Sequence, residues 1–259
     1  MLSTKNLSSN IVLGQLYALW LREIKVFLRE RSRLVASTFT PLLWLSVIGS
    51  GLGSTNLQIG TDYEKFIFPG IICMSVIFTS VFFGAYIIWD RKFDFLKSVM
   101  VAPSSRTTVF VGKTLGGMTT SLFQVAIVLV VGIALGINYD ALSLLQILSI
   151  VLILSFCLTS LGLTFGSYLE SLEGFQLIIS FIVFPLFFLS GALFPIDNLP
   201  AWLKLITLID PATYSVDALR NSILHLGTYS FEYDLAVLLL FTFIITIIGI
   251  LSFRRMKAV

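Results

Sequence analysis

Six long stretches without a charged residue make up most of this chain of 259 residues. They run over 34–61, 66–89, 114–139, 141–169, 174–196 and 235–253. A helix needs roughly 20 consecutive apolar residues to cross the hydrocarbon core of a bilayer. Backbone polar groups in lipid must bond within their own segment, so each stretch is expected to be an α-helix. The pattern therefore predicts an all-α polytopic membrane protein with six transmembrane helices.

Composition supports this fold class. Only 12% of the residues are charged and the mean hydropathy is +0.97, whereas soluble domains carry about 25% charged residues. The polar segments between the stretches are too short to enclose a core of their own. We therefore expect an N-terminal cytoplasmic helix within residues 1–33, followed by one six-helix transmembrane domain over 34–259.

Basic residues give an orientation. Three segments hold 14 of the 17 Lys and Arg residues: the one before the first span, the one between the second and third spans, and the one after the sixth. Segments rich in Lys and Arg stay in the cytoplasm. An even number of spans also places both termini on one side, so the two arguments agree that both termini are cytoplasmic.

The segment 11–33 is amphipathic. Apolar residues recur there at helical spacing, namely Leu13, Tyr17, Trp20, Ile24, Phe27 and Leu28. Arg22, Lys25 and Arg29 share another face, which is typical of a helix lying at the membrane interface. The same apolar face could instead pack on cytoplasmic loops of the protein, and one helix can make both contacts.

The segment 90–106 follows the second span and is dense in charge. Phe93, Leu96, Val99 and Met100 recur at helical spacing, and Pro103 ends the helix. A short amphipathic helix is therefore expected on the cytoplasmic side. It could lie flat on the membrane as a connector or dock into a groove on a partner protein, and the physical pattern leaves both open.

The segment 186–220 is too polar to span a membrane and too apolar to be a free loop. It predicts a pair of short helices that dip into the outer leaflet or cover the bundle. The residues that define this region are Pro195, Pro200, Trp202, Pro211, Tyr214, Asp217 and Arg220.

Glycine pairs four residues apart recur within the spans. They are Gly49 with Gly53, Gly112 with Gly116, Gly132 with Gly136, and Gly162 with Gly166. This spacing allows two helices to approach closely. Packing inside one subunit and contact between two subunits are both compatible with it.

Two of these segments resemble one known family. Residues 90–103 resemble the E-R-E-R-G-T-L-E-Q-L-L-V-T-P stretch of type-2 ABC transporter permeases, with matches at Asp90, Arg91, Leu96, Val101 and Pro103. The family usually has Gly where this chain has Asp94. Residues 186–220 match F-L-S-G-x-x-F-P-x-x-x-L-P-x-W-L and P-x-T-Y-x-V-D-A-L-R. The second match is similar to the daunorubicin-exporter and nodulation-lipooligosaccharide-exporter branches.

The resemblance implies a function. The chain would be the transmembrane permease subunit of an ATP-driven ABC exporter, in the plasma membrane of a bacterium or archaeon. It would form a homodimer, or a heterodimer with a second permease, and bind an ATP-binding cassette subunit. Its substrate would be hydrophobic or amphiphilic: a drug, a lipid or a lipid-linked saccharide. Docking on the ATP-binding subunit would use Asp90, Arg91, Phe93, Leu96, Lys97 and Met100, and the candidate substrate path would use Phe184, Phe187 and Phe188.

The sequence contains no motif that predicts ATP binding or catalysis by this chain itself. The nearest approach to a Walker A motif is Val111-Gly112-Lys113-Thr114, which has Thr107 where the motif needs Gly. We therefore expect no cofactor and no nucleic acid on this chain, no enzymatic activity, and ATP with Mg on the partner subunit. No acidic residue lies inside a predicted span, which argues against ion-coupled transport. An ion-coupled secondary transporter and a non-transporting membrane scaffold remain the alternative hypotheses.

Overall fold

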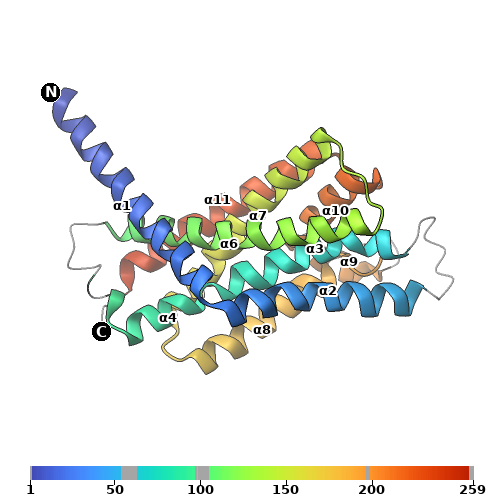
Figure 1. Ribbon diagram of the computed structural model, residues 1–259, viewed down its shortest axis with the longest axis horizontal. Coiled ribbons are helices and arrows are strands. Elements are labelled where there is room, and N and C mark those ends of the chain that lie inside the picture. The colour runs from blue at the N-terminus through green and yellow to red at the C-terminus, as the bar shows by residue number, and fades with distance from the viewer. Residues whose placement is uncertain (1, 54–62, 97, 99–104, 197–198, 257–259) are drawn as a thin grey trace.

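The computed structural model describes residues 2–53, 63–96, 98, 105–196 and 199–256. Within these ranges all regular secondary structure is helical, without a strand, and the predicted all-α fold is confirmed. The helices are α1 (Leu2–Arg29), α2 (Arg31–Gly53), α3 (Tyr63–Phe82), α4 (Ala85–Lys92), α6 (Arg106–Ala134), α7 (Ala141–Tyr168), α8 (Leu172–Leu189), α9 (Ala201–Thr207), α10 (Pro211–Leu224) and α11 (Phe231–Arg255) (Figure 1).

The spanning helices are those predicted, with one difference in length. Among the described residues five segments are long and apolar enough to cross a membrane, namely Tyr63–Lys92, Arg106–Ala134, Ala141–Tyr168, Leu172–Leu189 and Phe231–Arg255. At the first predicted span, α2 has a shorter apolar part, Val35–Gly49. Several helices extend beyond the uncharged stretches, so charged residues lie within their end turns.

The two ends of the bundle differ in character (Figure 1). Both termini, α4 and the connection between α7 and α8 lie toward one end, whereas α9 and α10 lie toward the other. The first end carries Lys92, Arg106 and Arg254 at helix termini. We call it the basic end and the other the opposite end. The shared location of the termini fits an even number of crossings.

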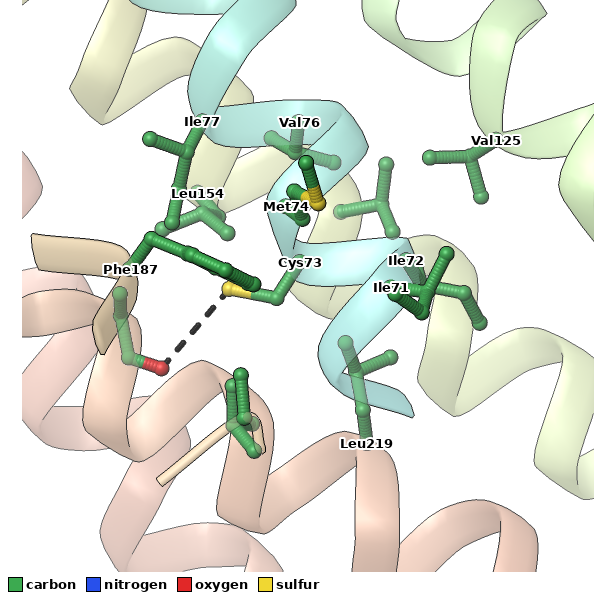
Figure 2. Packing of buried hydrophobic residues seen from close by; sticks show 14 of the residues in the cluster. Ile71, Ile72, Cys73, Met74, Val76, Ile77, Val125, Leu154, Phe187 and Leu219 are labelled. Carbon is green, nitrogen blue, oxygen red and sulfur yellow. Dashed lines mark hydrogen bonds between the residues drawn. The ribbon is translucent and has the colours of Figure 1, made fainter. Parts of the chain in front are cut away.

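The core is built around α3. Its residues Ile71, Ile72 and Cys73 are completely buried, because α3 packs against α2, α6, α7, α8 and α10 (Figure 2). The Cys73 thiol lies 3.9 Å from the carbonyl oxygen of Ala212 at the start of α10. Lipid tails are as apolar as these side chains, so close packing rather than the hydrophobic effect stabilises the bundle.

The second span is broken into α3 and α4 at Phe83 and Gly84. Backbone bonds there join residues three apart, from the Gly84 N–H to Val81 O at 3.1 Å and from the Tyr86 N–H to Phe83 O at 3.1 Å. Such bonds mark a tight 3₁₀ turn. A Cβ atom on Gly84 would overlap the carbonyl of Gly162 on α7, so the break lies directly against that backbone.

Glycines of α6 and α7 bring helices of the same subunit together. A Cβ on Gly162 would overlap the Val81 carbonyl, and a Cβ on Gly166 would overlap that of Gly84. On α6, Gly112 and Gly116 receive side chains of α1. For these two glycine pairs the structure therefore shows packing within one subunit.

Candidate functional site

Four charged side chains from three helices meet at the basic end. Arg22 and Glu23 come from α1, Asp90 from the last turns of α4, and Lys113 from α6. The Lys113, Glu23 and Asp90 side chains are 0%, 1% and 5% exposed, and that of Arg22 is 30% exposed. We call these four residues the ion cluster.

The ion cluster is closely bonded and neutral. Lys113 Nζ lies 3.0 Å from Glu23 Oε1 and also donates to Asp90 Oδ2. Arg22 donates to Asp90 Oδ1 at 2.6 Å and to Glu23 Oε1 at 2.6 Å. Burial opposes the charge of Arg22, but the bond to Asp90 and the nearby Glu23 carboxylate raise its pKa. Two cations facing two anions is the arrangement that buried charges require.

Small residues on α6 allow α1 to reach this position. A Cβ on Gly116 would overlap the Glu23 side chain, and one on Gly112 would overlap that of Leu19. Trp20 Nε1 then donates to Thr119 Oγ1 at 2.9 Å. One face of α1 thus packs on the protein itself, which was one of the two predicted contacts of this helix.

Another face of α1 has no protein cover among the described residues. Leu13 is 59% exposed, Tyr17 is 60% exposed and Leu28 is 53% exposed. Figure 1 shows the N-terminal half of α1 extending away from the bundle. The interfacial location of this apolar face remains a prediction.

The predicted amphipathic helix at 90–103 is wrong in one respect. Asp90 belongs to α4, which ends at Lys92, and Asp94 has a φ of 55° before helical residues resume at 95. This left-handed conformation favours glycine, and aspartate is among the few other residues that adopt it readily. Asp94, at the position where the resembled motif usually has Gly, thus has a backbone conformation that glycine favours.

The turn at Asp94 separates residues that were expected on one face. Phe93 is 70% exposed, whereas Leu96 is 1% exposed and packs in a small core with Phe83 and Ile87. The predicted contacts Lys97 and Met100, like Val99, Val101 and Pro103, lie outside the described residues.

Trp89, Lys92 and Phe93 form an exposed aromatic and basic surface at the end of α4, which we call the α4 patch. The Trp89 and Phe93 rings stack at 5.6 Å with 7° between their planes, and Lys92 Nζ lies 5.6 Å from the Trp89 ring centroid. Next to it, the Phe95 ring lies 3.7 Å below the guanidinium of Arg22. Phe95, two residues after Phe93, thus links the α4 patch to Arg22 of the ion cluster.

Arg91 donates hydrogen bonds to backbone carbonyls at the end of α7. Its Nη2 donates to Gly166 O at 2.7 Å and to Leu169 O, which are carbonyls at the end of α7. A cation at a helix C-terminus complements the helix dipole. A cavity of about 690 Å³ opens beside it, lined by Arg91, Lys92, Glu170 and Arg255 among others. Of the predicted docking residues that are described, Phe93 alone is in the exposed class, while Asp90 and Leu96 are buried and Arg91 is partly buried.

The three phenylalanines proposed for the substrate path do not share one surface. Phe187 is 1% exposed and makes edge contacts with Trp44 and Phe78. Phe184 and Phe188 are 46% and 39% exposed on α8, with their rings stacked at 6.4 Å. Phe187 is therefore part of the core, and only the other two are accessible.

The two short helices predicted at the opposite end are present and differ in burial. Trp202 on α9 is 64% exposed, and Pro200 before it is exposed, while Pro195 in the preceding connection is half-buried. By contrast α10 is buried between α3, α7, α8 and α11.

Buried polar groups hold α10 in place. Asp210 accepts the Ala212 N–H at 2.8 Å as the N-cap after which Pro211 starts the helix, and burial raises the pKa of Asp210 to about 8. Tyr214 donates to Leu208 O at 3.0 Å. Arg220 donates to Gly191 O at 2.8 Å and lies 4.2 Å above the Phe66 ring.

The sequence argument missed the ion cluster because it treated charged residues as the ends of spans. Lys113 was assigned to a loop, yet α6 begins at Arg106 and encloses it. Two signals were available: Glu23 is an acid inside a basic amphipathic segment, and Lys113 stands between Gly112 and Gly116.

Fold and site together define a multi-pass α-helical membrane protein with interlocked helices at its basic end. The chain belongs to the ABC-2 type transporter family, whose model matches residues 14–224. It is therefore the transmembrane subunit of an ABC transporter, in a family whose members in general work with an ATP-binding subunit. The family predicted from residues 90–103 and 186–220 is confirmed.

Individual relatives agree along most of the chain. The chain is 28% identical to the inner membrane transport permease YadH of Escherichia coli strain K12, over 87% of this chain and 89% of that protein. It is 25% identical to the ycf38 protein of Cyanophora paradoxa, over 97% and 92%. It is 26% identical to nodulation protein J of Rhizobium leguminosarum bv. viciae, over 71% and 72%.

Proposed function

We propose that this permease subunit exports a hydrophobic or amphiphilic substrate and takes its energy from a separate ATP-binding cassette subunit that docks on the α4 patch. The observation that carries the proposal is the position of the patch. Exposed aromatic rings and a cation, at Trp89, Lys92 and Phe93, adjoin a buried ion cluster that joins three helices. Aromatic side chains dominate the energetics of protein interfaces.

The contacts at the basic end supply a route for the movement. A force on Phe93 acts on α4, whose Asp90 is bonded to Arg22 of α1 and Lys113 of α6. Arg91, the next residue of α4, is hydrogen-bonded to the end of α7. Displacement of the docking surface would thus be passed to α1, α6 and α7 together.

Orientation follows from charge. The basic end would face the cytoplasm, with both termini there, because Lys and Arg concentrate in its segments. A bacterial or archaeal plasma membrane is the proposed location, and the inner-membrane name of the relative YadH supports it. ATP and Mg would bind to the partner subunit, and this chain would hold no cofactor.

The exposed face of α8 supports an apolar substrate. Phe184 and Phe188 present stacked rings there, and Phe181 is 82% exposed. A second copy of the chain, or a second permease, would complete the path between two subunits, and these rings would contact the substrate's apolar part.

The test replaces the α4 patch and follows the partner. Trp89→Ala and Phe93→Ala should remove the co-purifying ATP-binding subunit and its ATPase activity from the tagged chain in nanodiscs. Because both side chains are exposed, the unfolding midpoint should stay unchanged. Trp202→Ala is the matched control, since this exposed aromatic lies at the opposite end.

Two outcomes would contradict the proposal. If the double variant retained its ATP-binding subunit in full, the α4 patch would not be the docking surface. If vesicles holding this chain alone moved substrate along an ion gradient without ATP, the secondary-transporter hypothesis would replace the exporter.

A further inference from the structure

The cavity beside Arg91 is lined by charges of both signs. It lies at the basic end, where α4, α7 and α11 end and α8 begins, and its volume is about 690 Å³. Pockets for small ligands are commonly of this size. Three of the residues that line it are cations, Arg91, Lys92 and Arg255, and two are acids, Glu170 and Glu173. The lining therefore offers partners to an anionic group and to a cationic group at once.

Some of these charges have protein partners and others do not. Arg91 is hydrogen-bonded to the carbonyls at the end of α7. Lys92 is exposed and contacts only the face of the Trp89 ring among the described residues. Glu173 and Arg255 are exposed as well, and neither makes an ion pair within the described part of the chain. One carboxylate, one guanidinium and one ammonium group are thus available to a ligand.

The deeper part of the cavity is apolar and held in place by neighbouring helices. Ile88 and Met256 are buried there, and Leu172 is half-buried. Tyr168 at the end of α7 donates to Ser252 Oγ of α11 at 3.0 Å, which joins two walls of the cavity. A ligand whose charged groups meet the acids and cations can therefore place carbon atoms against this apolar part.

An exposed apolar stripe on α11 leads to the cavity. It consists of Leu240, Ile244, Ile248 and Leu251, which recur every three or four residues and so share one face of the helix. Arg255 follows Leu251 by four residues and continues the same face. In a membrane-spanning helix, an apolar face that ends in a cation is suited to lipid tails followed by a headgroup. The stripe therefore favours a lipid as the occupant of the cavity.

The two acids narrow the choice of headgroup. A headgroup with only a phosphate could use Lys92 and Arg255, but it would bring an anion close to Glu173. A trimethylated ammonium has no N–H to donate to a carboxylate, whereas a primary ammonium has three. A phosphodiester joined to a primary amine matches both signs of charge in the lining.

We propose that this cavity binds one phospholipid with a phosphoethanolamine headgroup. Lys92 and Arg255 would hold the phosphate, Glu170 and Glu173 would accept hydrogen bonds from the ammonium, and an acyl chain would lie along the stripe on α11. The bound lipid would connect the end of α11 with the start of α8. This site goes beyond the docking of an ATP-binding subunit and does not depend on it.

Native mass spectrometry tests the proposal on the full chain released from nanodiscs. The nanodiscs contain equal parts of phosphatidylethanolamine, phosphatidylcholine and phosphatidylglycerol. One phosphatidylethanolamine should stay bound to each chain. Arg255→Gln removes a charged donor to the phosphate and should weaken retention of the lipid about tenfold. Glu173→Gln should remove the preference for phosphatidylethanolamine over phosphatidylcholine.

Two control variants carry the same changes away from the cavity. Arg29→Gln on α1 and Glu232→Gln on α11 replace exposed charged residues, and both should retain the lipid and its preference. Because Glu173 and Arg255 are also exposed, their variants should unfold at the wild-type midpoint. A change in lipid binding then reports on the site itself.

Three outcomes would overturn the proposal. Equal retention of all three lipids by the wild type would show only the non-selective lipid shell of a membrane protein. Stronger retention of phosphatidylglycerol would show that Glu170 and Glu173 do not select the headgroup. Displacement of the lipid by an equal concentration of soluble glycerophosphoethanolamine would show a site for a free phosphate compound, in which the apolar stripe has no part.

Discussion

Replacement of Lys113 by methionine is the sharpest test of the ion cluster. Methionine has nearly the volume of lysine, so Lys113→Met removes the charge from a fully buried side chain without creating a cavity. Glu23 and Asp90 would then share only Arg22, whose side chain is 30% exposed. Removing one partner of a buried ion pair costs about 3–5 kcal/mol of unfolding free energy.

That loss converts to a measurable shift. One kcal/mol corresponds to about 2–4 °C of midpoint in chains of 150–250 residues, so Lys113→Met should unfold roughly 6–20 °C below the wild type. Adding Glu23→Gln restores equal numbers of charges and should recover part of the loss. The two substitutions should therefore be non-additive by about 0.5–3 kcal/mol.

The chain carries its own reporter for the measurement. Cys73 and Cys157 are both buried and unbridged, so a thiol-reactive fluorophore labels them only as the bundle opens. Unfolding of membrane proteins is commonly irreversible, and midpoints should be compared at a single heating rate. A Lys113→Met midpoint equal to that of the wild type, or strict additivity with Glu23→Gln, would refute the energetic role of the cluster.

Three further results are expected. Gly162→Ala should lower the unfolding midpoint strongly because its Cβ would overlap the Val81 carbonyl, whereas Gly14→Ala has open space and should change little; equal midpoints would contradict the backbone contact. Phe187→Ala should cost about 3–5 kcal/mol of stability, measured by the same thiol assay, and a wild-type midpoint would exclude Phe187 from the core. Phe184→Ala should leave the midpoint unchanged and reduce ATP-dependent substrate uptake into inverted vesicles, and unaltered uptake would exclude Phe184 from the path.

Hydropathy and charge predicted the helices because lipid permits so few backbone arrangements. The positions of the spanning helices follow from uncharged stretches alone, and the short helices at the opposite end follow from proline spacing. The uncharged stretches do not predict where a helix ends, because a helix continues through charged residues whenever those residues find partners. Lys113 and Asp90 lie inside helices for that reason.

The candidate site was predicted only in part, for a similar reason. Helical spacing placed Phe93 and Leu96 on one face, but a left-handed residue at Asp94 rotates the chain between them. Spacing also cannot separate Phe187 from Phe184, because neighbouring helices decide which ring is covered.

The crossing of the broken second span over α7 limits how this protein can change. Gly84, Gly162 and Gly166 meet backbone to backbone, so each already has the smallest side chain available. When a residue enlarges at an ordinary packed contact, a neighbour can shrink to compensate. No such compensation exists here, and a lineage that loses one of these glycines could restore the contact only by reversion or by moving a whole helix.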